Sequence, residues 1–304
     1  MTTTKKLDQY LDPKILTKIK KLDLQARLIV EGFLTGRHRS PFHGFSVEFA
    51  QHREYAPGDD LRHLDWKVFA KSDRYYIKQY EAETNLRCTF VLDTSESMAF
   101  THDPKIESKL EYAKYIVASL SYLLTQQQDA VGLVTYDSKV DTFLRPGSSP
   151  THFRLMLHQL AEKNPANKSD VASLFDDLAQ RFNRRGLVVI VSDLFDTPEN
   201  ILKGLSHFRM RRHEVIVFHI MDQFEISFPY EEFTMFEGME GWSDLLVDPR
   251  SLRAGYLKEM NDFCGRMERG CQASGIDYIR LDTSKPLDVE LAAYLAWRLT
   301  TKKR

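Results

Sequence analysis

The sequence predicts an α/β protein with a mostly parallel β-sheet and helices on both faces. Two apolar runs of strand length end in an acid, the first at Asp93 and the second at Asp193. Stretches with helical periodicity separate the apolar runs from residue 93 onward, and strands that alternate with helices form parallel sheets. A chain of 304 residues with 42% hydrophobic content can bury a core of this kind.

Each predicted element rests on its own pattern. Continuous apolar runs predict buried strands, strict alternation predicts an edge strand, and apolar residues at three- and four-residue steps predict helices. In chain order the expected elements are strand 88–93, helix 106–124, strand 130–136, edge strand 139–144, helices 153–161 and 171–182, strand 187–192, helix 200–208, strand 213–220, helix 252–271, strand 276–281 and helix 287–299.

Residues 1–84 have a different character from the α/β region at 85–304, and we predict a boundary between the two. An amphipathic helix at 13–33 leads into a loop rich in Gly, His, Arg and aromatic residues. Residues 224–246 are aromatic and acidic and show no helical period. We expect this segment to fold back onto the N-terminal region, as part of a small β-rich subdomain.

The charge balance argues against a nucleic-acid partner. Lys and Arg number 42 against 43 Asp and Glu, so the formal net charge is -1 and no general basic field exists. The longest apolar runs, such as 187–191, are far too short to cross a bilayer. We therefore expect a cytoplasmic protein without a transmembrane segment.

The run 88–93 ends in Asp93-Thr-Ser95-Glu-Ser97, which places a carboxylate and two hydroxyls at alternate positions. Such residues leave a strand on the same side and can converge at its carboxyl end, where α/β sheets bind ligands. Oxygen ligands of this kind suit Mg²⁺. The alternative is that Ser97 or Thr94 only caps the helix that follows.

Two further groups extend the predicted cation site. Asp193 ends the second central strand as Asp93 ends the first, so the two carboxylates can face one cavity. Ser169 lies at the start of the helix expected from Val171, where its hydroxyl can cap that helix or bind a metal, and Asp170 is the fallback ligand.

Together, these residues resemble the metal-ion-dependent adhesion site of von Willebrand factor A domains. The resemblance implies an Mg²⁺ site, with Mn²⁺ or Ca²⁺ as alternatives, in which a partner's carboxylate fills the open position of the cation. Ser169 stands where that family usually has Thr, and the hydroxyl is retained. The implied ligands are Asp93, Ser95, Ser97, Ser169 and Asp193.

A block before the first central strand carries a second resemblance. It contains Arg53-Glu-Tyr-Ala-Pro-Gly-Asp-Asp-Leu-Arg62-His-Leu-Asp65-Trp66-Lys67, followed by Lys78-Gln-Tyr-Glu-Ala-Glu83. This block is similar to the family catalogued as domain of unknown function 58, in which it precedes a von Willebrand factor A domain. Family members often occur beside MoxR-type AAA ATPases. The resemblance therefore implies a non-enzymatic adaptor that binds such an ATPase or an acidic client protein.

The charges of the same block allow two interpretations. They can form a salt-bridged network that only fixes the loop, or they can form a surface on which a partner docks. The candidate partner-binding residues are Arg53, Tyr55, Asp59, Asp60, Arg62, Asp65 and Trp66.

An enzyme and a purely structural domain remain as alternatives to the adaptor. Asp59, Asp65 and Lys67 loosely imitate the acids and lysine of metal-dependent nucleases. A phosphatase of the haloacid dehalogenase type would need a second Asp where Ser95 stands. The third possibility is a structural domain whose cation site is vestigial. The sequence contains no Gly-x-x-x-x-Gly-Lys-Ser/Thr motif, so it predicts no P-loop chemistry.

Overall fold

The chain divides into two compact units, which we describe separately. A computed structural model describes residues 46–54, 68, 75–83, 86–167 and 171–301. One unit is His38–Leu86, and the larger unit contains Arg87–Arg304. The described part of the smaller unit is a two-stranded antiparallel sheet of β1 (Ser46–Glu54) and β2 (Tyr76–Glu83), with an irregularity between Phe49 and Gln51.

The larger unit is built on a six-stranded sheet in the order β10-β7-β6-β3-β4-β5. Neighbouring strands pair in parallel except β5, an edge strand antiparallel to β4. Every residue of β6 is buried, as the continuous apolar run predicts for a central parallel strand. The strands are β3 (Arg87–Asp93), β4 (Ala130–Tyr136), β5 (Val140–Gly147), β6 (Leu187–Ser192), β7 (Glu214–Met221) and β10 (Asp277–Asp282).

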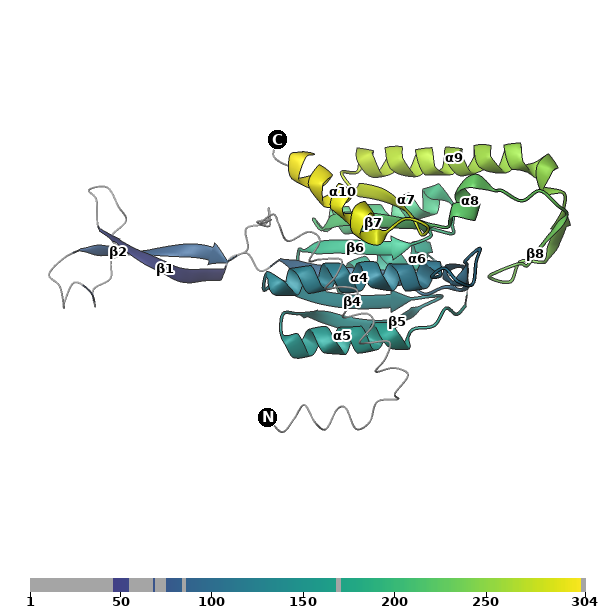
Figure 1. The fold of residues 1–304 in the computed structure, drawn as a ribbon. Coiled ribbons are helices and arrows are strands. Elements are labelled where there is room, and N and C mark those ends of the chain that lie inside the picture. Colours follow the sequence, from purple (N-terminus) through teal and green to yellow (C-terminus); the bar gives the residue numbers. More distant parts are fainter. Residues whose placement is uncertain (1–45, 55–67, 69–74, 84–85, 168–170, 302–304) are drawn as a thin grey trace, which may run out of the picture. The chain divides into compact units, whose positions relative to one another are not determined.

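Helices cover both faces of this sheet (Figure 1). On one face, side chains of α6, α7 and α9 such as Phe175, Phe208 and Met267 form one buried cluster with Val91 and Val217 of the strands. On the other face, α4 contacts β3, β4, β6 and β7, and α5 contacts β4 and β5. The helices are α4 (Lys109–Gln126), α5 (Pro150–Glu162), α6 (Val171–Arg181), α7 (Pro198–Met210), α8 (Gln223–Ser227), α9 (Pro249–Ala273) and α10 (Leu287–Thr301).

The predicted strands and helices from residue 88 are therefore confirmed in their order, and the short helix α8 is one that the sequence pattern does not predict. Helix α9 is longer than expected because Asp248 caps its N-terminus and Pro249 begins it, and proline fits the first helical turn. None of the described helices is long and apolar enough to cross a membrane.

Between α8 and α9 the chain forms an extended segment, residues 229–248, which we call the arm (Figure 1). It carries β8 (Thr234–Phe236) and β9 (Leu245–Val247), which pair in antiparallel fashion. Arg253 of α9 donates hydrogen bonds to the backbone at Phe228 and Tyr230, at the root of the arm. The root of the arm is thus held by α9 of the same unit, and the predicted packing of residues 224–246 against the N-terminal segment stays a prediction.

Candidate metal centre

The carboxyl ends of β3 and β6 lie side by side at the centre of the sheet. Leu92 pairs with Val191, so Asp93 at the end of β3 is level with Ser192, and Asp193 follows directly. The chain leaves β3 for β4 on one side while β6 lies on the other, so the strand order reverses here. Open α/β sheets bind ligands at this kind of switch point.

The carboxylate of Asp93 is fully buried and held by three hydrogen bonds. Its Oδ1 accepts from the backbone N–H of Ser95 at 2.9 Å, and its Oδ2 accepts from the Ser192 hydroxyl at 2.7 Å and the Tyr136 hydroxyl at 3.3 Å. The Ser192 hydroxyl also accepts from the backbone N–H of Leu194 at 2.8 Å. The orientation of Asp93 is therefore fixed from both neighbouring strands.

Ser95 and Ser97 bring their hydroxyls together directly after β3. The two Oγ atoms lie 3.1 Å apart and both residues are buried. Ser95 precedes the short 3₁₀ helix η2 (Glu96–Ala99), yet its side chain makes no capping hydrogen bond, and Ser108 caps α4 instead. Thr94 donates its hydroxyl to the carbonyl of Tyr136. The helix-capping interpretation of this motif is therefore wrong, and the two hydroxyls face one another.

Asp193 lies next to a buried lysine. Its Oδ2 accepts from Lys109 Nζ at 2.7 Å, and the same ammonium donates to Glu225 Oε1 at 2.8 Å. Burial lowers the pKa of Lys109, but the two carboxylates outweigh this, so the pKa lies above its ordinary value and the amine is charged. Asp193 Oδ1 is also buried, and no residue in the described part of the chain donates a hydrogen bond to it.

The two aspartates influence each other electrostatically. Burial, and then the charge of Asp193, raise the pKa of Asp93 to about 7, against the opposing hydrogen bonds from Ser192 and Ser95. Two close buried carboxylates are unfavourable without a compensating cation. The donor set consists of two carboxylates and two hydroxyls, and it includes the buried Asp193 Oδ1, to which no described residue donates, so it fits a hard divalent cation.

The middle ligand of the predicted site lies outside the described residues, because Ser169 and Asp170 fall in the gap 168–170. The chain that leads into this gap is held against the motif. The carbonyl of Asn167 accepts from the backbone N–H of Glu96 at 2.9 Å, and the N–H of Ala166 donates to the carbonyl of Thr94 at 2.9 Å. Ser169 therefore stays a prediction, now with its preceding residues anchored beside Ser95 and Ser97.

The signature block contributes little to the described structure. Arg53 lies in β1, where its backbone pairs with Ile77 of β2. The other candidate docking residues, Tyr55, Asp59, Asp60, Arg62, Asp65 and Trp66, lie outside the described residues, as does Lys67 of the nuclease alternative. The docking surface and the nuclease alternative both remain predictions.

The sequence does not identify four residues that shape the site: Lys109, Tyr136, Ser192 and Glu225. The sequence could have indicated Ser192, because this residue directly precedes Asp193 at the end of a predicted strand. Lys109 and Glu225 are 116 residues apart in the chain and meet only through tertiary folding. Among the described residues, no group of three or more His, Cys, Asp or Glu side chains is placed to hold a metal ion, at the candidate site or elsewhere.

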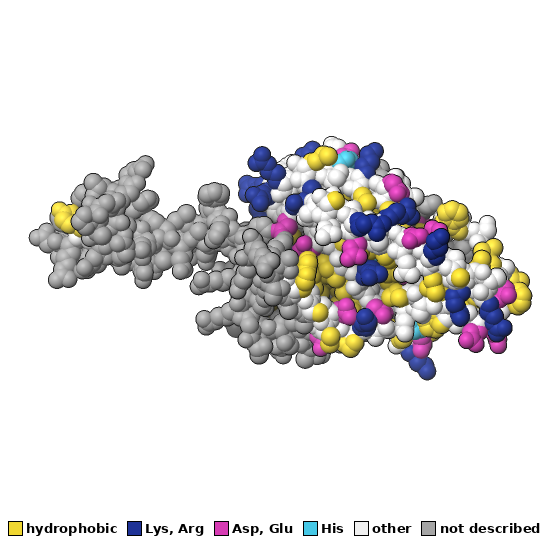
Figure 2. All heavy atoms as spheres, turned by 90° about the horizontal axis from the view of Figure 1, so that it is seen from above, with side chains coloured by type: hydrophobic (Ala, Val, Ile, Leu, Met, Phe, Trp, Pro, Cys, Tyr) yellow, Lys and Arg dark blue, Asp and Glu magenta, His cyan; other side chains and the backbone are white. Residues whose placement is uncertain are grey.

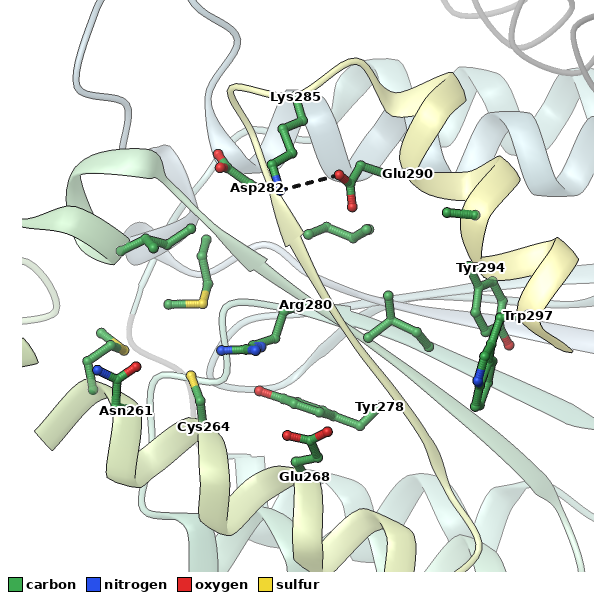
Figure 3. Close-up of a pocket in the computed structure, with 16 residues that line it drawn as sticks. Asn261, Cys264, Glu268, Tyr278, Arg280, Asp282, Lys285, Glu290, Tyr294 and Trp297 are labelled. Carbon is green, nitrogen blue, oxygen red and sulfur yellow. Dashed lines mark ion pairs between the residues drawn. The ribbon is translucent and has the colours of Figure 1, made fainter. Parts of the chain in front are cut away.

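Two cavities flank this region of the fold. One of about 1010 Å³ is lined by Lys109, Ser138 and Asp193 together with residues of α9 and the arm. Another of about 660 Å³ follows β10, between α9 and α10, with Lys285 and Glu290 paired at 3.6 Å at its rim (Figure 3). Only the first cavity includes a predicted cation ligand, so it is the one that belongs to the candidate site.

The raised pKa of Asp93 predicts how the metal-free protein responds to pH. A folded-state pKa of about 7 means that the folded protein retains a proton that the unfolded chain loses near its ordinary value of about 4. Stability in EDTA should therefore fall as pH rises from 4 to 7. Asp93→Asn lacks this titration. Between pH 5 and pH 8 we therefore expect the free energy of unfolding of wild type to fall by at least ~1.4 kcal/mol more than that of Asp93→Asn, the equivalent of one pKa unit. Urea unfolding followed by circular dichroism measures this, and parallel pH profiles would contradict it.

The fold is a von Willebrand factor A-like α/β module, in which an antiparallel edge strand joins a parallel sheet. The chain belongs to the family described as "Protein of unknown function DUF58", whose model matches residues 51–263. Both confirm the predicted fold class and the predicted family. The chain is 25% identical over 292 residues to uncharacterized protein Rv1480 of Mycobacterium tuberculosis and to uncharacterized protein Mb1516 of Mycobacterium bovis, covering 94% of this chain and 90% of each relative.

Solved structures show more distant similarity. The conserved hypothetical protein BatB from Bacteroides thetaiotaomicron aligns with a TM-score of 0.46 and 15% identity, over 71% of this chain and 100% of that chain. The SpRpn10 VWA domain aligns with a TM-score of 0.38 and 11% identity, over 67% of this chain and 92% of that chain.

Proposed function

We propose that this protein is a non-enzymatic, metal-dependent protein-binding module, which acts as a cytoplasmic adaptor for a MoxR-type AAA ATPase. The observation that carries the proposal is the group of Asp93, Ser95, Ser97 and Asp193 at the switch point of the sheet. Bound Mg²⁺, or Mn²⁺ or Ca²⁺ in its place, would supply an electrophilic position for the carboxylate of a partner.

The residues of the site have distinct roles in this proposal. The Ser95 and Ser97 hydroxyls, 3.1 Å apart, would bind the cation directly, and Asp93 and Asp193 would hold it directly or through water. The hydrogen bonds from Ser192 and Tyr136 keep Asp93 oriented toward the motif. Few directly bound charges leave the cation with affinity for an external acid, which supports a role in recognition.

The surroundings of the site support a protein partner rather than a small ligand. The cavity beside Asp193 is lined by aromatic side chains that include Phe195 and Trp242, which are 53% and 65% exposed. The arm carries further exposed apolar side chains, and Figure 2 shows apolar atoms gathered at that end of the larger unit. These side chains are Phe233, Met235, Leu245 and Leu246. Exposed apolar groups of this kind mark protein interaction surfaces.

Partner capture tests the proposal. Immobilised wild-type protein should retain a purified MoxR-type ATPase from the same organism in Mg²⁺ and release it in EDTA. The double variant Ser95→Ala/Ser97→Ala should lose at least about tenfold in affinity, because it removes both hydroxyl ligands while keeping the carboxylates. Ser148→Ala, at an exposed loop position, is the matched control. If the ATPase is retained equally in EDTA and by the double variant, cation-mediated docking is rejected.

A further inference from the structure

The hairpin of the arm has an exposed apolar face. Met235 of β8 pairs directly with Leu246 of β9, and directly paired residues of an antiparallel ladder have their side chains on the same face. Phe233 extends this face, because it lies two residues before Met235 and alternate residues of an extended chain point the same way. The side chains of Phe233, Met235 and Leu246 are 76%, 56% and 61% exposed. We call these three residues the arm face.

The opposite face of the hairpin is occupied by aromatic packing. Phe236 stacks on Phe228 with the ring centroids 5.8 Å apart, and its ring lies 5.0 Å from that of Tyr230. Phe228 in turn lies 4.5 Å from Tyr256 of α9. A two-stranded hairpin is only marginally stable on its own, so this packing holds it on the larger unit. The packing uses one face of the hairpin and leaves the arm face exposed.

The charge of the arm has a single sign. Residues 229–248 contain six acidic residues and no lysine or arginine. Glu237 continues the line of Phe233 and Met235, so an acid borders the arm face. Among the described residues, no basic side chain pairs with Glu231, Glu232 or Glu237, and all three are exposed. The apolar face therefore has an acidic margin whose charge is available to a binding partner.

This combination of charge and shape restricts what can cover the arm face. Acidic side chains repel the phosphates of nucleic acids and the headgroups of anionic membranes. Exposed apolar groups rimmed by polar ones mark protein interaction sites. The two strands lie about 4.8 Å apart, and a helix about 10 Å across spans both of them. An amphipathic helix with basic residues beside its apolar stripe matches the arm face in both shape and charge.

We propose that the arm face binds an amphipathic, basic helix of a partner protein. The apolar stripe of that helix packs on Phe233, Met235 and Leu246, and its lysine or arginine side chains pair with Glu237 and the other acids of the arm. The inference rests on the proposed protein-binding role and names the chemistry of the partner. The contact itself requires no cation, so it can be tested in the absence of metal.

A labelled synthetic helix of leucine and lysine is the probe, and fluorescence anisotropy in EDTA measures its binding. Wild type should bind this peptide saturably, and added salt should weaken the binding because it screens the acids of the arm. The same peptide with glutamate in place of lysine should bind at least about tenfold more weakly. A scrambled leucine–lysine peptide without an apolar stripe should be weakened to the same extent.

Variants of the arm locate the binding. Met235→Ser/Leu246→Ser should weaken binding of the leucine–lysine peptide at least about tenfold, and so should Glu231→Lys/Glu237→Lys, which keeps the apolar side chains. The matched controls are Leu155→Ser on α5 and Asp262→Lys on α9, which change an exposed apolar and an exposed acidic side chain elsewhere and should bind as wild type does. Circular dichroism checks that each variant is folded, and the charge variant alone decides if the serine variant is not.

The outcomes identify any other occupant of the arm face. Equal peptide binding by wild type and both arm variants would overturn the inference. A wild-type dimer in sedimentation that Met235→Ser/Leu246→Ser converts to a monomer would show that the arm face binds a second copy instead. Binding to phosphatidylserine vesicles that the same variant loses would show that it binds a membrane.

The proposed function and this inference fail separately. A lack of peptide binding in EDTA, together with Mg²⁺-dependent capture of the ATPase, would overturn the role of the arm face and leave the proposed function standing. Peptide binding that depends on the arm face, without capture of the ATPase, would overturn the adaptor role and leave the arm face as a binding site.

Discussion

Saturating Mg²⁺ should raise the unfolding temperature of the wild-type protein and leave that of Asp93→Asn nearly unchanged. A ligand that binds only the folded state stabilises it by ~2.7 kcal/mol at a hundredfold excess over its dissociation constant. For a unit of this size that corresponds to roughly 5–10 °C. The effect depends on Asp93 because its carboxylate is the buried acid at the motif, held by Ser192 and Tyr136.

Asparagine is the suitable replacement because it keeps the shape of Asp93. Its amide oxygen can still accept from the N–H of Ser95, and its NH₂ group can still reach the Ser192 hydroxyl, so the fold should survive in EDTA. Thermal unfolding of both proteins is compared in EDTA and in saturating Mg²⁺. Na⁺ at the same ionic strength is the control for a general salt effect. Equal shifts in the two proteins would show that Mg²⁺ acts elsewhere, and no shift in wild type would argue for a vestigial site.

The sequence is sufficient to predict the central sheet and half of the candidate site. Continuous apolar runs of strand length that are rich in β-branched residues indicate buried strands, and two of them end in Asp93 and in Ser192-Asp193. In a parallel sheet the carboxyl ends of neighbouring strands meet at one edge, so their proximity follows from local patterns alone. The alternation of Asp93, Ser95 and Ser97 needs no tertiary information either.

The residues that the sequence leaves unidentified depend on contacts between distant segments. Lys109 begins a helix, where a lysine is ordinarily solvated, and only the fold places it 2.7 Å from Asp193. Glu240 lies in a segment without periodicity, and its backbone N–H donates to Glu96, which is 144 residues away in the chain. No local pattern encodes such a pairing, because each partner has the same propensities whether or not the other is nearby.

Lys109→Met should destabilise the protein by about 3–5 kcal/mol, a loss at the upper end of what a single substitution causes. The Lys109 side chain is 2% exposed, and its ammonium donates to Asp193 at 2.7 Å and to Glu225 at 2.8 Å. Methionine fills a similar volume but removes the charge, so the buried Asp193 and the partly buried Glu225 lose their cation. Urea unfolding measures the loss, and Lys105→Met, at an exposed position in the preceding loop, should stay within ~0.5 kcal/mol of wild type.

A double-mutant cycle distinguishes an electrostatic loss from a packing loss. If stranded charge causes the instability, Lys109→Met/Asp193→Asn should recover part of it, because the second substitution neutralises one of the two unpaired carboxylates. Mg²⁺ should also stabilise Lys109→Met by more than it stabilises wild type, since Asp193 is then free of its ammonium partner and the cation is the remaining source of positive charge at the site. Additive losses in the double variant, with an unchanged Mg²⁺ effect, would mean that Lys109 contributes through its packed methylene chain rather than by balancing the acids of the candidate metal centre.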